Sequence, residues 1–360
     1  MEQRDMDARW ATLSCRTAIL LAVFTLLAPI APFGQSTART FIDAAQRSVV
    51  VPGRIEKVLA AGPPAATALY TLAPGKLAGW PRPPGPDARA FMPERYADLP
   101  VHSRLTGHAE PAYEHIVAMR PDLIIDIGTV NPAYAAIAER AQQATKISYL
   151  LLDGSLPATP ALYRALGDLL GEPARAADLA TRSTAMLDSV RDRVGALTLA
   201  ERKRVYVARG PGGNDSWTAG SFNAEIIELA GAVNVVTSAE KLNPGDISPE
   251  RVTTWNPDVI IALDPAFLRT IETDMAWRQV PAVAAGNVYL APQRPFGWTD
   301  DPPSVNRLLG LRWLAGLLHA ERFADDIRGL TRDFYAAFYH VTLDDPQLDQ
   351  LLRGAIAVKR

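Results

Sequence analysis

The chain has 360 residues, of which 48% are hydrophobic and 21% are charged, a composition typical of a globular protein long enough for two domains. Lysine and arginine total 37 and aspartate and glutamate total 39, so the formal net charge is −2. This balance argues against a nucleic-acid-binding protein, which needs a basic face for the phosphates.

The N-terminus has the order of an export signal. Arginines precede an apolar run at residues 18–27, and prolines, a glycine and the small residues Ser36 and Ala38 follow it. Small residues fit the −3 and −1 places of a cleavage site, and the run is too short to span a bilayer comfortably. We therefore predict a signal peptide that is cleaved after Ala38. A retained membrane anchor is the alternative.

The single cysteine, Cys15, lies before the apolar run. Cleavage leaves no cysteine in the mature chain, which excludes disulfides, thiolate metal sites and cysteine nucleophiles. This also fits an oxidising compartment outside the cytoplasm.

Strand and helix patterns alternate between residues 48 and 153. Apolar strands are predicted at 57–61, 76–80, 123–127 and 146–152, and helices at 63–72 and 132–144. A proline-rich loop covers residues 81–111. Strands separated by helices indicate a parallel sheet that is covered on both faces.

Apolar residues recur at helical spacing from Leu162 to Leu197. We predict one long helix of about 36 residues, roughly 54 Å at 1.5 Å per residue, which Pro173 can bend because it lacks a backbone donor. Such a helix would limit hinge bending between the segments on its two sides.

Strand and helix patterns resume at residue 204. Strands are predicted at 205–208, 259–263 and 287–291, and helices at 219–229, 304–318 and 323–340, with a short closing helix from 344. Ligand sites in parallel sheets lie beyond the carboxyl ends of the strands. The loops that follow the strands should therefore face a cleft.

One phrase occurs twice, 136 residues apart (250 − 114). Glu114, Ile116 and 121–125 are matched by Glu250, Val252 and 257–261. Each copy predicts a short helix, a Pro-Asp turn and a buried strand. Two copies so far apart indicate two similar lobes and not a solenoid. We interpret both glutamates as helix-start residues, which acids favour.

The predicted fold is therefore α/β, with two similar lobes that each contain a mainly parallel sheet and flanking helices, joined by one long helix. The predicted boundaries are 1–38 for the signal peptide, 39–155 for the N-terminal lobe, 156–200 for the connecting helix, 201–343 for the C-terminal lobe with its terminal helices, and 344–360 for the C-terminal tail.

Both Pro-Asp phrases, the segments 58–63 and 219–234, and the motif at 298–311 carry a family resemblance. The chain resembles the substrate-binding proteins of bacterial metal-chelate ABC importers, the helical-backbone class that serves siderophore-iron, haem, cobalamin and some metal oxyanions. The resemblance implies a monomeric periplasmic protein that captures an iron-siderophore or similar chelate and delivers it to an inner-membrane permease with a cytoplasmic ATPase. It implies no catalysis, cofactor or resident metal. Importers of this kind use one acidic docking residue per lobe, for which Glu114 and Glu250 are candidates.

Arginine and aromatic residues in the predicted cleft loops suit an anionic, partly apolar chelate. The candidate ligand-binding residues are Trp80, Arg82, Gly128, Thr129, Tyr134, Arg209, Trp217, Arg294, Phe296 and Trp298. Structural alternatives stay open: Arg209 can pair with a surface carboxylate, Trp80 can fill its lobe, and Tyr134 can pack a helix.

Several other patterns have simpler interpretations. Asp300 and Asp301 precede two prolines, which is typical of a helix start. His102, His108 and His115 have no predictable further partner for zinc, so no metal site is predicted. An enzyme is the rival class, but the chain lacks a nucleophile elbow and a phosphate loop. A molybdate/tungstate-type or cobalamin receptor on the same fold is the closer alternative.

Overall fold

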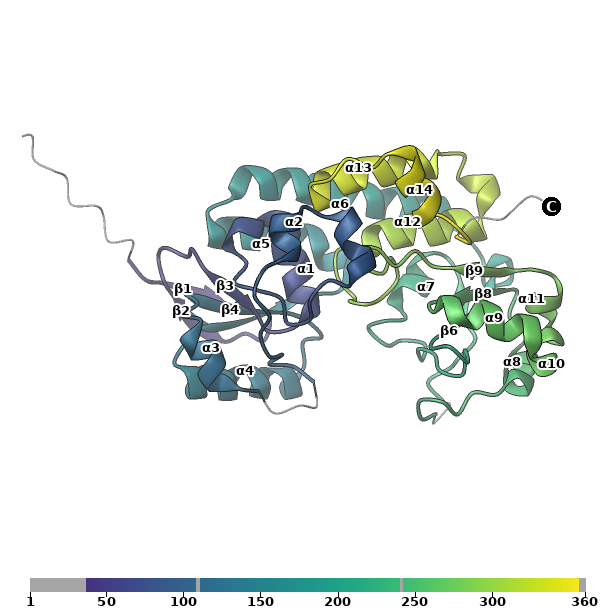
Figure 1. The fold of residues 1–360 in the computed structure, drawn as a ribbon, viewed down its shortest axis with the longest axis horizontal. Coiled ribbons are helices and arrows are strands. Elements are labelled where there is room, and N and C mark those ends of the chain that lie inside the picture. Colours follow the sequence, from purple (N-terminus) through teal and green to yellow (C-terminus); the bar gives the residue numbers. More distant parts are fainter. Residues whose placement is uncertain (1–36, 108–110, 240–241, 356–360) are drawn as a thin grey trace, which may run out of the picture. The chain divides into compact units, whose positions relative to one another are not determined.

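The computed structural model describes residues 37–107, 111–239 and 242–355, and the predicted signal peptide lies outside them except for its last two residues. Short parallel strands alternate with helices (Figure 1). The strands are β1 Arg39–Ile42, β2 Ser48–Val51, β3 Val58–Ala60, β4 Leu123–Gly128, β5 Tyr149–Asp153, β6 Arg204–Ala208, β7 Val233–Asn234, β8 Val259–Ala262 and β9 Val288–Leu290. The α-helices are α1 Pro63–Leu72, α2 Glu94–Ala97, α3 Tyr113–Ala118, α4 Pro132–Thr145, α5 Thr159–Leu170, α6 Pro173–Val194, α7 Glu225–Leu229, α8 Pro249–Trp255, α9 Pro265–Thr273, α10 Met275–Arg278, α11 Pro281–Ala284, α12 Arg307–Leu318, α13 Ile327–Tyr339 and α14 Asp345–Leu351.

The N-terminal lobe contains a three-stranded parallel sheet in the order β3-β4-β5, and β1 and β2 form an antiparallel pair. The two faces of the parallel sheet belong to different apolar clusters: Ile125 packs in one and Ile124 in the other. Burial on both faces explains the continuous apolar run of β4. Each fully buried isoleucine contributes roughly 1.5–3 kcal/mol.

The C-terminal lobe contains a four-stranded parallel sheet in the order β7-β6-β8-β9. Its central strand β8 pairs with β6 and β9, as β4 pairs with β3 and β5. The predicted α/β fold with two similar lobes is therefore confirmed. The predicted domain boundaries stay a prediction.

The repeated phrase has the same structural role in both lobes. The Oδ2 atom of Asp122 accepts hydrogen bonds from the backbone N–H groups of Glu56 and Lys57, both at 2.8 Å. The Oδ2 atom of Asp258 accepts one from the N–H of Arg204 at 2.7 Å. Each aspartate therefore fastens its own strand to the start of the neighbouring strand. This contact explains why the Pro-Asp turn occurs twice.

The predicted strand at 76–80 is wrong. In this segment, isolated bridges join Leu77 to Val58 and Trp80 to Val101. The bridge from Leu77 lies beside β3, as β7 lies beside β6. The lobe thus has one bridge where its counterpart has a short strand, because Pro74–Lys76 forms a 3₁₀ turn immediately before it.

The single connecting helix of about 36 residues is also corrected. Gly171 adopts a left-handed conformation (φ 72°) that ends α5, and Pro173 starts α6. The two helices pack closely, since a Cβ on Gly167 would lie 2.1 Å from the Cβ of Ala176. The longer helix α6 packs against α1 of the N-terminal lobe and α12 of the C-terminal lobe.

The helix predicted at 219–229 is shorter than expected. Gly220 has a φ of 75° and lies in a turn, so α7 starts only at Glu225. The helix predicted from Ser304 starts at Arg307. The closing helix α14 follows the predicted start closely, with Asp344 as its cap.

Candidate functional site

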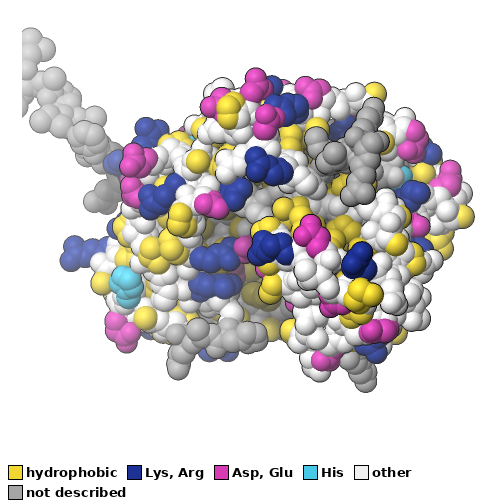
Figure 2. Space-filling model, turned by 45° about the vertical axis from the view of Figure 1, so that its right-hand side comes forward, with side chains coloured by type: hydrophobic (Ala, Val, Ile, Leu, Met, Phe, Trp, Pro, Cys, Tyr) yellow, Lys and Arg dark blue, Asp and Glu magenta, His cyan; other side chains and the backbone are white. Residues whose placement is uncertain are grey.

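A pocket of about 320 Å³ lies at the carboxyl end of β4, where parallel sheets place their ligands. Both lobes contribute to it: Gly128 and Tyr134 come from the N-terminal lobe, and Phe222 and Asn223 from the C-terminal lobe. Its charged residues are Arg82, Arg104, Asp126, Arg209, Asp300 and Asp301. We call this site the cleft pocket. One face of the molecule is hollowed, and side chains of both charges gather around the hollow (Figure 2).

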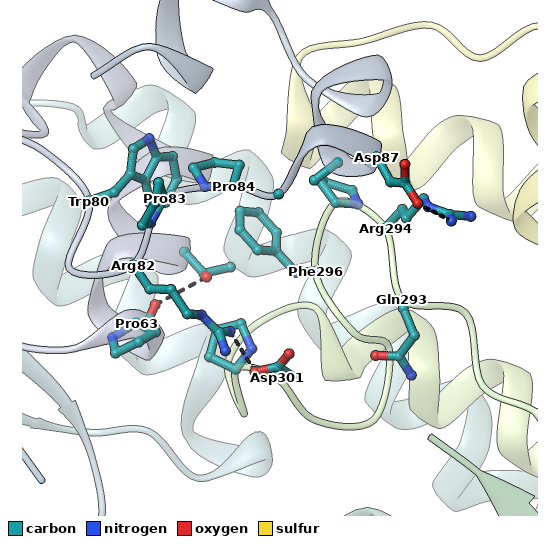
Figure 3. A pocket seen from close by; sticks show the side chains of 15 residues that line it. Pro63, Trp80, Arg82, Pro83, Pro84, Asp87, Gln293, Arg294, Phe296 and Asp301 are labelled. Carbon is teal, nitrogen blue, oxygen red and sulfur yellow. Dashed lines mark hydrogen bonds and ion pairs between the residues drawn. The ribbon is translucent and has the colours of Figure 1, made fainter. Parts of the chain in front are cut away.

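A second pocket of about 410 Å³ adjoins the cleft pocket. We call it the proline pocket, because Pro83 and Pro84 line it together with Trp80 and Phe296 (Figure 3). Pro295 also lines it. The two pockets have four residues in common, namely Pro63, Arg82, Asp301 and Pro302. The apolar walls of the proline pocket can cover the organic part of a ligand.

Two ion pairs join the lobes at the proline pocket (Figure 3). Arg82 Nη2 of the N-terminal lobe lies 2.5 Å from Asp301 Oδ1, and Arg294 Nη2 of the C-terminal lobe lies 2.7 Å from Asp87 Oδ2. All four side chains are partly exposed, and such surface pairs contribute only ~0–1 kcal/mol each. An anionic ligand can therefore compete for either arginine at low cost.

The arginines of the cleft pocket differ in their existing partners. Arg209 Nη1 lies 2.8 Å from Asp215 Oδ2, and its guanidinium carbon lies 6.0 Å from the ring centre of Trp217. Arg104 forms neither an ion pair nor a hydrogen bond within the described part of the chain. Among the described residues nothing occupies its donors, which suit a carboxylate or an oxyanion.

Asp126 is a buried acid in the wall of the cleft pocket. Its side-chain Oδ2 accepts a hydrogen bond from the Tyr149 hydroxyl at 3.1 Å. Burial raises the pKa of Asp126 from 3.8 to about 6, although the bonds from Tyr149 and the backbone of Ile127 oppose the shift. The repeat departs here, because the matching residue of the other lobe is Ala262, which packs in an apolar cluster.

We expect Asp126→Asn to stabilise the unliganded protein at high pH. The folded-state pKa is raised, so stability from this group is present at low pH and lost as pH rises through about 6. The free energy of unfolding of Asp126→Asn should exceed that of the wild type by about 1–2 kcal/mol more at pH 8 than at pH 5. Urea unfolding of both proteins at the two pH values measures it. An equal difference at both values would contradict the pKa assignment.

Asp300 and Asp301 are not the helix start that the sequence predicts. The helix α12 begins six residues after Asp301, at Arg307. Both acids line the cleft pocket, where Asp300 Oδ2 accepts a hydrogen bond from Asn223 at 3.1 Å. Burial raises the pKa of the Asp300 carboxyl, partly offset by its backbone bond and the charge of Arg209.

The structure separates the candidate ligand-binding residues into three groups. Those in the cleft pocket are Arg82, Gly128, Thr129, Tyr134 and Arg209. Those in the proline pocket are Trp80, Arg82, Arg294 and Phe296. Trp217 and Trp298 lie in the core instead.

Core burial of the tryptophans follows from their contacts. Trp298 is fully buried and its ring lies 6.3 Å from that of Trp313. Trp80 is 2% exposed, and its indole N–H donates to the Tyr96 carbonyl at 2.7 Å. Trp80 therefore fills its lobe and also lines the proline pocket.

Several residues of the cleft pocket were missed from the sequence: Arg104, Thr106, Asp126, Phe222, Asn223, Asp300 and Asp301. The break in the repeat at Asp126 was a usable signal, because an acid replaced an alanine within a buried strand. Arg104 gave none, since it lies in a loop whose path depends on the folded lobe.

A metal site requires several ligating side chains close together, and a membrane-spanning helix requires a long apolar run. In residues 37–107, 111–239 and 242–355, no group of three or more histidines, cysteines or acids is placed to hold a metal ion. His102 is buried beside the Ser103 carbonyl, and His108 lies outside these ranges. Within the same ranges, no helix is both long and apolar enough to cross a membrane.

Solved structures share this fold. A solute-binding protein of an ABC transporter from Sulfurospirillum deleyianum is 29% identical, with a TM-score of 0.79 over 88% of this chain and 99% of that chain. The molybdate-bound protein MolA of Haemophilus influenzae is 20% identical, with a TM-score of 0.69 over 85% and 99%. The vitamin B12-binding protein BtuF of Vibrio cholerae is 19% identical, with a TM-score of 0.57 over 74% and 97%. No curated protein sequence matches the chain.

A sequence-family model described as periplasmic binding protein matches residues 91–295. This is 205 residues (295 − 91 + 1), more than half of the 360. The chain belongs to the periplasmic binding protein family, and the resemblance seen in the sequence is confirmed.

Proposed function

We propose that this protein is the extracytoplasmic substrate-binding component of an ABC importer, and that it captures an iron-siderophore or a similar metal chelate. The observation that carries the proposal is the cleft pocket, which opens at the carboxyl end of β4 and takes residues from both lobes. Three arginines from three separate loops line it, and guanidinium groups bind carboxylates and oxyanions in two bonds.

The adjoining proline pocket supports a chelate with an organic part. Its prolines and the ring of Phe296 offer an apolar wall, whereas the cleft pocket offers charge. A ligand that extends from one pocket into the other would replace the Arg82–Asp301 ion pair with its own contacts.

A molybdate/tungstate-type receptor is the alternative, because the arginines alone could hold a tetrahedral oxyanion. The structural similarity to the molybdate-bound protein of Haemophilus influenzae is consistent with this alternative. The similarity to the vitamin B12-binding protein is consistent with a cobalamin receptor. In each of these roles the protein binds without catalysis and requires no cofactor of its own.

Delivery of the ligand requires a permease with a cytoplasmic ATPase, and the monomeric protein would meet it in the periplasm after its signal peptide is cleaved. Glu114 and Glu250 lie in the first turns of α3 and α8, at matching positions of the repeat. Both side chains are exposed. We propose them as the acidic docking residues, one in each lobe.

A Gly128→Leu variant tests capture in the cleft pocket. A Cβ at Gly128 meets no heavy atom within 4 Å, so the fold should tolerate the side chain while it fills the pocket. In a deletion strain of the native host, wild-type protein should restore the cellular content of iron, cobalt, nickel or molybdenum. The variant should fail to restore it, because the leucine side chain occupies the space of the ligand. A loss of ~1.4 kcal/mol or more of binding free energy lowers the affinity at least 10-fold.

Gly75→Leu is the matched control, because a Cβ at exposed Gly75 also meets no heavy atom within 4 Å and this residue lies in a 3₁₀ turn away from the cleft pocket. It should restore the metal content as the wild type does. Full restoration by Gly128→Leu would contradict capture in the cleft pocket.

A further inference from the structure

The cleft pocket is balanced in charge, although an anion receptor would be expected to carry an excess of arginine. Three arginines line it, and so do three aspartates, Asp126, Asp300 and Asp301. All three acids accept hydrogen bonds from the protein: Asp301 from Arg82, Asp300 from Asn223 and Asp126 from Tyr149. Asp126 is the most buried of the three.

Asp126 is 3% exposed, and its carboxylate accepts hydrogen bonds from the Tyr149 hydroxyl and from the backbone of Ile127. No described arginine forms an ion pair with it. A buried carboxylate without a cationic partner costs stability. The other lobe avoids this cost with Ala262 at the matching position of the repeat.

A carboxylate in this position distinguishes between the two ligand classes that the arginines would accept. It can accept a hydrogen bond from an N–H or O–H group of a ligand. A fully ionised oxyanion such as molybdate has only acceptor atoms, so it would place negative charge beside Asp126 without a proton between them. Like charges close together repel, and the repulsion is stronger when one of them is buried, as Asp126 is. A site can exclude a ligand by such repulsion.

We propose that Asp126 determines ligand specificity, by accepting a hydrogen bond from a ligand that carries both anionic groups and N–H or O–H donors, and by excluding fully ionised oxyanions. This inference rests on the proposed function and narrows its ligand class. Arg104 and Arg209 hold the anionic end of such a ligand, and Asp126 receives its donor group at the end of β4.

The test compares two probes on the wild type and on Asp126→Asn, by isothermal titration calorimetry at pH 7.5. The nickel(II)–bis-histidine complex carries carboxylates and N–H donors, and sodium molybdate carries acceptors alone. The wild type should bind the nickel complex at least about 10-fold more tightly than molybdate, the scale of one charged hydrogen bond. The affinity of Asp126→Asn for the nickel complex should be lower than that of the wild type, and its affinity for molybdate should be higher. Each change should be about 10-fold or more.

Asp168→Asn is the control, because it removes the same charge from an exposed position that pairs with Arg39. It should leave both affinities within about twofold. Equal binding of the two probes by the wild type, a change of both affinities in the same direction in Asp126→Asn, or binding of neither probe would overturn the inference. The proposed function is judged separately, by the restoration of metal content with Gly128→Leu.

Discussion

Replacement of Arg307 by alanine is expected to lower the free energy of unfolding by ~3–5 kcal/mol, the range for breaking a buried ion pair. The Arg307 side chain is fully buried at the start of α12, and its Nη2 lies 2.8 Å from Glu225 Oε1. The same guanidinium donates to the carbonyls of Phe222 at 3.0 Å and Gly154 at 3.2 Å. The substitution would leave a partly buried carboxylate and two carbonyl groups without these donors.

The contacts of Arg307 also link the lobes beneath the site. Gly154 follows β5 of the N-terminal lobe, whereas Phe222 lines the cleft pocket from the C-terminal lobe. The ring of Phe222 also lies over the guanidinium, at 4.7 Å. Loss of Arg307 should therefore loosen one wall of the cleft pocket as well as destabilise the fold.

Thermal unfolding measures this effect, and the midpoint should fall by about 5–8 °C for a chain of this size. Glu225→Gln is the second single variant of a double-mutant cycle. The Leu156 N–H donates to Glu225 Oε1 at 2.9 Å, and the amide oxygen of glutamine can still accept this bond. The double variant should be at least about 1 kcal/mol more stable than the sum of the single losses predicts. Additive losses would show that the pair is not coupled.

Ligand affinity should fall by ~1.5–3 kcal/mol in Arg209→Ala and also in Arg104→Ala, the scale of a hydrogen bond to a charged group. Both side chains line the cleft pocket, and Arg104 has no partner of its own within the described residues. Its loss should therefore affect binding without affecting the unfolding midpoint. Calorimetry with the nickel(II)–bis-histidine complex measures the affinity.

Arg182→Ala is the matched control for the two arginine variants. Like Arg209, Arg182 pairs with one aspartate, Asp178, but it lies on α6 outside the cleft pocket. Its affinity for the nickel complex should equal that of the wild type. If Arg104→Ala and Arg209→Ala also bind as the wild type does, the arginines do not form the anion site.

The architecture could be predicted because its signals are local. The Pro-Asp phrase specifies a turn and a buried strand within a few residues, and Asp122 and Asp258 then make equivalent backbone contacts in the two lobes. The division of the connecting helix into α5 and α6 also has a local signal, because Gly171 is followed two residues later by Pro173. Its apolar spacing continued across the break because α5 and α6 face the same core.

The site was only partly predictable, because its residues meet through the tertiary fold. The rule for strand ends found Gly128, which ends β4, and Thr129 and Arg209, which follow β4 and β6 directly. It missed Arg104, whose loop reaches the pocket from elsewhere. Asp300 resembled a helix cap because prolines follow it, and only the later start of α12 places it in the cleft.

Tryptophan is the residue type for which the sequence was least informative. A tryptophan in a loop can cover a ligand or fill a core, and the sequence pattern is the same in both cases. Trp217 and Trp298 fill the core, whereas Trp80 does so while touching the proline pocket.

Ligand capture in the cleft pocket can be measured by native mass spectrometry of protein isolated from the periplasm of its native host, combined with elemental analysis. We expect one metal chelate per chain on the wild type and none on Gly128→Leu. Wild-type protein that carries no ligand when the host is actively importing the metal, or a Gly128→Leu variant that retains the same ligand, would contradict capture in the cleft pocket.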